Sequence, residues 1–168
     1  RNGKFDSADQ LRFTATGISS RFAVGAVGAA VADLDGDGRN DLVLAAAEGI
    51  QIRSGNDLEK VQSVLPVPNA TWVSASDLDG DGRPELIVSK YHDGVIYDTQ
   101  SAIFWNGPSG FSAQRVSWVP TKGAMGNTSG DLDGDGRPEV IFNNTMSGHC
   151  CAVPSYIYLG NKEAKYGV

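Results

Sequence analysis

The sequence has few of the residues that most often mark catalytic or redox centres. Its 168 residues include two histidines and two cysteines, and the two cysteines are adjacent. No apolar run approaches the roughly 18 residues of a membrane span. No cluster of lysine and arginine indicates a nucleic-acid partner. The sequence therefore predicts neither a membrane span nor a nucleic-acid-binding surface.

Helical periodicity is also missing, whereas glycine is abundant, with 21 residues. The apolar runs are short, as at residues 42–44, 86–88 and 140–142, and turn residues bound each of them. Short apolar runs between turn signals are typical of β-strands. The expected fold class is all-β.

Acidic charge is concentrated in three nonapeptides, which we call acidic loops one, two and three. They read DLDGDGRND at 33–41 and DLDGDGRPE at both 77–85 and 131–139. Together they hold 12 of the 20 acidic residues of a chain with a formal charge of −6. Two carboxylates about 5 Å apart repel by about 3 kcal/mol at an effective dielectric of about 20. A bound cation would offset this repulsion.

The alternating aspartates favour calcium, because a hard cation of this size takes six to eight oxygen ligands. Three Ca²⁺ ions are expected, one in each loop.

An EF-hand is excluded because position 12 is Leu44, Val88 or Phe142, where that motif needs glutamate. Magnesium is disfavoured because it keeps its waters, and ordinary Asp-Gly turns do not explain three near-identical copies. In each loop the acidic residues would bind through their side chains and the arginine at position seven through its backbone carbonyl. The predicted ligands are Asp33, Asp35, Asp37, Arg39 and Asp41; Asp77, Asp79, Asp81, Arg83 and Glu85; and Asp131, Asp133, Asp135, Arg137 and Glu139.

The loops belong to a longer repeat. They begin at Asp33, Asp77 and Asp131, 44 and 54 residues apart, and strand-like segments recur around each of them. Four strands in a period of this size are typical of a β-propeller blade. We therefore expect one partial propeller domain over 1–168, with an outer strand at 1–16, blades at 17–68 and 69–120, and an incomplete blade at 121–168. Because three blades do not close a ring, the rest of a longer propeller or a second copy of the chain is the expected partner.

The loops, together with the segment SAIFWNGPSGFSAQR at 101–115, resemble the FG-GAP (VCBS-type) repeats of integrin-like propellers. The resemblance extends over nearly the whole chain. It implies a ring of six to eight blades of four antiparallel strands, with calcium between the first and second strands of a blade. It also implies a secreted or cell-surface protein. It does not fix the function, since such repeats occur in integrin heads, lectins and polysaccharide lyases.

Unequal connections suggest where a ligand binds. The connection opposite the acidic loops is only Glu48-Gly49 in the first blade, but spans 92–100 in the second and 146–154 in the third. Long loops on a rigid scaffold often carry recognition. The candidate ligand-binding residues on this face are Trp72, Tyr91, His92, Tyr97, Met125 and His149. Core packing for Trp72 and plain solvent exposure for the histidines remain alternatives, whereas Trp105 and Trp118 lie within strand patterns and are expected in the core.

The favoured function is a lectin-like or cell-adhesion module that binds carbohydrate or protein. One alternative is a polysaccharide lyase or hydrolase with His92 or His149 and Tyr97 as acid and base. Another is a purely structural assembly subunit. No catalytic partner lies near either histidine in the sequence, so a binding role is favoured over an enzyme.

Cys150 and Cys151 are adjacent. Their Cα atoms are about 3.8 Å apart, shorter than the usual disulfide span. A strained vicinal disulfide, two free thiols and an intermolecular bridge all remain open.

Overall fold

Eleven β-strands and no helix make up the described part of the chain. The structure is a computed structural model, which describes residues 25–148 and 151–160. The predicted all-β class is confirmed. The strand expected within residues 1–16 lies outside the described residues.

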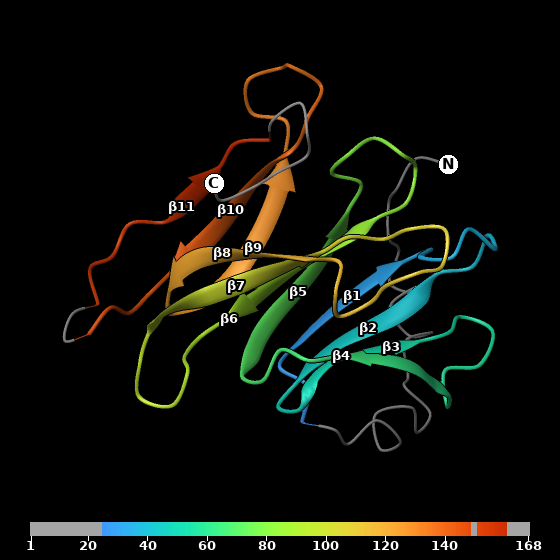
Figure 1. The fold of residues 1–168 in the computed structure, drawn as a ribbon, viewed down its shortest axis with the longest axis horizontal. Coiled ribbons are helices and arrows are strands. Elements are labelled where there is room, and N and C mark those ends of the chain that lie inside the picture. Colours follow the sequence, from blue (N-terminus) through green and yellow to red (C-terminus); the bar gives the residue numbers. More distant parts are fainter. Residues whose placement is uncertain (1–24, 149–150, 161–168) are drawn as a thin grey trace, which may run out of the picture.

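The strands form three antiparallel sheets that follow one another along the chain (Figure 1). Within each sheet, strands that are neighbours in sequence are also hydrogen-bonded neighbours. Sheet one contains β1 (Gly28–Ala32), β2 (Asp41–Ala46), β3 (Gly49–Arg53) and β4 (Val61–Leu65). Sheet two contains β5 (Ala70–Ser76), β6 (Glu85–Lys90), β7 (Asp98–Phe104) and β8 (Val116–Lys122). Sheet three contains β9 (Ala124–Gly130), β10 (Glu139–Asn144) and β11 (Tyr156–Tyr158) among the described residues.

Sheet two has a hydrophobic core on each face. All six residues of β6 are buried. Leu86 and Val88 belong to the core shared with sheet one, whereas Ile87 between them belongs to the core shared with sheet three. Because successive side chains on a strand point to opposite faces, a strand covered on both sides needs a continuous apolar run. This explains the unbroken Leu-Ile-Val sequence.

The first strands of the sheets, β1, β5 and β9, lie beside one another (Figure 1). Gly28 on β1 leaves room for Trp72 on β5, because a Cβ at Gly28 would lie 2.9 Å from the Trp72 Cα. The Thr71 hydroxyl donates to the Ala124 carbonyl oxygen on β9 at 2.7 Å. Small residues on these strands therefore permit close contact between neighbouring sheets.

The leucine at position two of each acidic loop is buried where the next sheet along the chain packs against its own sheet, and exposed in sheet three, where none does among the described residues. Leu34 is 5% exposed and Leu78 is 2% exposed, whereas Leu132 is 60% exposed. The loops have nearly the same sequence, so the difference comes from packing. The ring is not closed within the described residues, and sheet three leaves one blade face open.

Candidate metal centre and ligand face

The backbone of each acidic loop is wrapped around its first aspartate. In loop one, Asp33 Oδ1 accepts the Gly36 N–H at 2.8 Å and Asp33 Oδ2 accepts the Gly38 N–H at 2.9 Å. Gly36 and Gly38 have φ values of 78° and 84°, which residues with a Cβ rarely adopt. The same two bonds recur in loops two and three within 0.1 Å. The sequence thus encodes one loop conformation three times.

The carboxylates at positions three and five are also held by the backbone. Each accepts the N–H of the residue two positions further on, at 2.8–3.1 Å in all three loops. Such local bonds are typical of aspartate in turns. They orient these carboxylates within the loop.

The position-nine acids begin the second strand of each sheet and lie below the loops. Asp41, Glu85 and Glu139 are only 2%, 0% and 1% exposed. Glu85 Oε2 accepts the Leu78 N–H at 2.7 Å, and Glu139 Oε2 accepts the Leu132 N–H at the same distance. These buried acids close the inner side of each loop.

Three acidic clusters result, each with ligand atoms within 4.8 Å of one another. Two contain the position-nine acid; their members are Asp77, Asp79 and Glu85, and Asp131, Asp133 and Glu139. The third contains Asp33, Asp35 and Asp37 and leaves out Asp41. The Asp41 side chain is one methylene shorter, and its oxygens accept the N–H groups of Leu34 at 3.1 Å and Gly55 at 2.8 Å. Loop one therefore differs from the other two, although its sequence suggests the same site.

Among the described residues, the acidic clusters have no paired basic side chain to balance their negative charge. Within residues 25–148 and 151–160, no ion pair joins a loop carboxylate to lysine or arginine. The pKa of Glu85 is raised from 4.5 to about 7, chiefly because the carboxyl is buried and also because of the charges of Asp79 and Asp77, while backbone hydrogen bonds act in the opposite direction. A buried carboxylate beside two aspartates is a donor set that suits a divalent cation.

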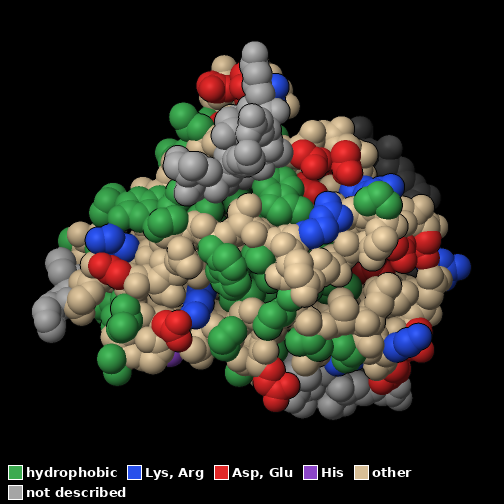
Figure 2. All heavy atoms as spheres, viewed as in Figure 1, with side chains coloured by type: hydrophobic (Ala, Val, Ile, Leu, Met, Phe, Trp, Pro, Cys, Tyr) green, Lys and Arg blue, Asp and Glu red, His purple; other side chains and the backbone are tan. Residues whose placement is uncertain are grey.

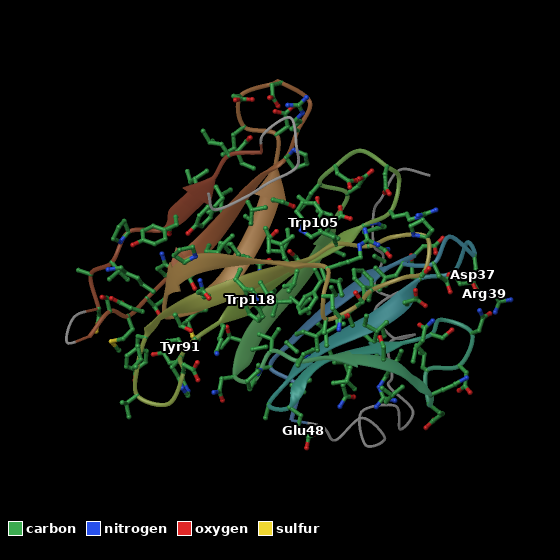
Figure 3. The ribbon with its side chains drawn as sticks, viewed as in Figure 1. Asp37, Arg39, Glu48, Tyr91, Trp105 and Trp118 are labelled. Atoms are coloured by element: carbon green, nitrogen blue, oxygen red, sulfur yellow. The ribbon has the colours of Figure 1, made fainter. Side chains whose placement is uncertain are left out.

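The predicted ligand-binding residues separate into two groups. Tyr91, His92 and Tyr97 form an edge-to-face aromatic cluster with ring centroids 5.2–6.1 Å apart. Trp72 on β5 and Met125 on β9 are 41% and 49% exposed and have no ring contact with this cluster. His149 lies outside the described residues. Tyr91 and Asp37 lie at opposite ends of the domain (Figure 3).

The expectation for the other two tryptophans was right for one of them. Trp105 is partly buried against the core between sheets two and three, and its indole N–H donates to the Ser117 hydroxyl at 2.9 Å. The prediction that Trp118 lies in the core was wrong, because Trp118 is 42% exposed. A strand pattern gives the face to which a residue points, but it does not show how far the neighbouring sheet extends over that face.

Cys151 is exposed and forms no disulfide in the structure. Its neighbour Cys150 lies outside the described residues, so the vicinal disulfide stays one of the three alternatives. No helix of the described residues is long and apolar enough to cross a membrane.

Stacked antiparallel sheets of three or four strands among the described residues, each with an acidic loop between its first and second strands, define a propeller-type repeat. The FG-GAP-like repeat family matches this chain twice, at residues 33–88 and 77–142, which together span more than half of it. The chain belongs to that family. No curated protein matches the sequence.

Proposed function

We propose that this domain is a calcium-stabilised binding module of a secreted or cell-surface protein. The observation that carries the proposal is the buried glutamate at position nine of loops two and three. Each glutamate faces two aspartates, and no basic side chain of the described residues is paired with them. Burying a carboxylate without a counter-charge is costly even where backbone N–H groups bond to it, and a Ca²⁺ ion in the loop would offset that cost.

Calcium fits the donor set better than magnesium does. The loop offers carboxylates at positions one, three, five and nine and a backbone carbonyl at position seven, all oxygen donors. Calcium accepts six to eight such ligands in a flexible arrangement, whereas magnesium demands a strict octahedron and keeps waters. We propose one ion per loop, with residues 17–68, 69–120 and 121–168 as the blades that the ions hold.

Ligand binding is proposed at the end opposite the acidic loops. Only residues 47–48 connect β2 to β3, whereas 91–97 connect β6 to β7 and 145–155 connect β10 to β11. The aromatic cluster stands on the middle connection. Its base is anchored, since the Asn69 side-chain amide donates to the His92 carbonyl oxygen at 3.5 Å, and the Asp93 and Ile96 backbones bond to each other. A fixed base under partly exposed aromatic residues supports a recognition role.

A calcium titration followed by calorimetry tests the metal half of the proposal. Three ions per chain are expected, with loop one weaker because Asp41 stands apart from its cluster. A titration without binding heat, together with a calcium-free protein by elemental analysis, would contradict the proposal.

Replacing residues 92–97, which precede β7, with an Asn-Gly turn tests the ligand half. Ligand capture should fall while calcium content and folding persist. If the shortened protein still captures the ligand, recognition lies elsewhere; if it unfolds, the connection is structural.

A further inference from the structure

Sheets one and two can be compared position by position, which shows where sheet two departs from what a blade requires. Trp118 on β8 lies opposite Ala102 on β7, and Val64 on β4 lies opposite Gln51 on β3. We count residues along the paired strands of each sheet, starting from the end of its acidic loop. By this count, Val64 in sheet one and Trp118 in sheet two occupy equivalent positions. Valine suffices there in sheet one, so the fold itself does not require a tryptophan.

The Trp118 ring is oriented from beneath but remains open to solvent. It contacts the buried Phe104 edge to face, with centroids 6.5 Å apart and planes at 70°. Yet 42% of Trp118 is exposed. A large exposed indole that is held in one orientation is suited to stacking on a ligand.

Trp118 lines a pocket of about 430 Å³, which it shares with Ile96 and with the polar side chains of Lys90, Asp93, Asp98 and Gln100. Pockets of this size hold small ligands. Figure 3 places Trp118 near the middle of the viewed face, and Figure 2 shows a hydrophobic patch there beside basic and acidic side chains.

The pocket belongs to sheet two alone. The residues equivalent to Lys90 and Gln100 in sheet one are Ala46 and Gly49. Sheet one also lacks the longer connection that supplies Asp93 and Ile96. Relative to sheet one, sheet two therefore has three different residues at equivalent positions and one longer connection, and all of them line the same pocket.

The charges around the pocket are balanced in pairs. Lys90 Nζ lies 3.1 Å from Asp93 Oδ2, and Lys122 Nζ lies 3.6 Å from Asp98 Oδ2. The Ser147 hydroxyl also donates to Asp98 Oδ1 at 2.7 Å. The two lysines balance the charges of the two aspartates, so these four side chains carry no net charge that would attract an ion. The carboxylate oxygens and the Gln100 amide can still form hydrogen bonds with hydroxyl groups.

We propose that this pocket binds a neutral saccharide. The apolar C–H face of a sugar ring would stack on Trp118, and its hydroxyls would donate to Asp93 and Asp98 and bond to the Gln100 amide. The inference rests on the proposed binding role and names its ligand class and subsite. It does not depend on the calcium sites.

The test measures binding of neutral saccharides to the whole calcium-loaded chain by saturation-transfer NMR. The probes are glucose, galactose, N-acetylglucosamine and lactose at millimolar concentration, with glucuronate as a charged comparator. At least one neutral sugar should bind, and Trp118→Val should weaken its binding about tenfold or more. Val64→Ala, at the equivalent position of sheet one, should leave the affinity unchanged.

Gln100→Ala is the second variant, since it alters the pocket without removing a core contact, and it should also weaken binding. Circular dichroism confirms that each variant is folded. The inference is overturned if no neutral sugar binds, if only glucuronate binds, or if both folded pocket variants keep full affinity. Failure of the calcium proposal would appear separately, as a missing effect of calcium on the stability of the wild type.

Discussion

The side-chain amide of Asn106, on the loop between β7 and β8, donates a 2.8 Å hydrogen bond to the Leu34 carbonyl oxygen in acidic loop one. It also donates to the Pro84 carbonyl oxygen at 3.3 Å, while the Asn106 backbone N–H donates to Glu85 Oε1 at 3.3 Å. One residue thus joins the loop of one repeat to the loop of the next. Neighbouring candidate metal sites are therefore mechanically connected.

Replacing Asn106 with alanine should destabilise the domain by about 1–3 kcal/mol, because two buried carbonyl groups lose their donor. Urea unfolding at saturating calcium measures this change. Asn40→Ala, an exposed asparagine in loop one, is the matched control and should change stability by less than about 0.5 kcal/mol. Equal effects of the two variants would show that the link contributes no stability.

Replacing Glu85 with glutamine should remove one calcium ion and leave two. At about 1 mM calcium, a site with a Kd of about 10⁻⁴ M contributes roughly 1.4 kcal/mol of stability, and the variant should lose that amount. Elemental analysis and unfolding in calcium are the measurements. The control is Glu48→Gln, which alters an exposed glutamate at the opposite end of sheet one. A variant that still binds three ions would rule out Glu85 as a ligand.

Stability of the metal-free protein should depend on pH through Glu85. Its pKa is raised from 4.5 to about 7, so between these values the folded chain holds a proton that the unfolded chain releases. This contribution is fully present below about pH 4.5 and is lost as the pH rises through about 7. Relative to Glu85→Gln, wild type in EDTA should lose about 2–3 kcal/mol between about pH 5 and about pH 8.

Unfolding of the two proteins at both pH values checks this prediction, and the variant accounts for all other titrating groups. Calcium should reduce the pH effect in wild type, because the ion favours the ionised carboxylate. A difference between the two proteins that stays constant with pH would show that Glu85 has an ordinary pKa.

The open face of sheet three should promote association. Leu132 and Ile157 are 60% and 55% exposed, and exposed apolar patches often mark interaction surfaces. Light scattering on the 17.7 kDa chain should show a mass that rises with concentration. Replacing both residues with glutamate should lower that mass, whereas Val95→Glu, at a 90% exposed site in the connection between β6 and β7, should not. A monomer at every concentration would contradict this expectation.

The sequence predicts features whose causes are local. Each acidic loop closes within nine residues through bonds from its own backbone, so its conformation follows from residue spacing. The four-strand repeat can also be predicted from the sequence, because apolar runs and turn residues alternate along the chain. The strands of sheets one and two confirm it.

Features that depend on contacts between sheets could not be predicted. Asn106 and Leu34 are 72 residues apart, and no periodicity shows that they bond. The absence of Asp41 from its cluster depends on a bond to Gly55, on the loop after β3. The exposure of Trp118 depends on how far sheet one extends across its neighbour. In each case the missing information is the relative position of two sheets.

Thermal unfolding in calcium, in magnesium and in EDTA tests the central claim most directly. Three sites of about 10⁻⁴ M at about 1 mM calcium would add about 4 kcal/mol, and a weaker site in loop one lowers this sum toward about 3 kcal/mol. The corresponding rise in Tm is roughly 10 °C for a domain of this size. We predict this rise in calcium, and a much smaller one in magnesium. An identical Tm in all three solutions would contradict it.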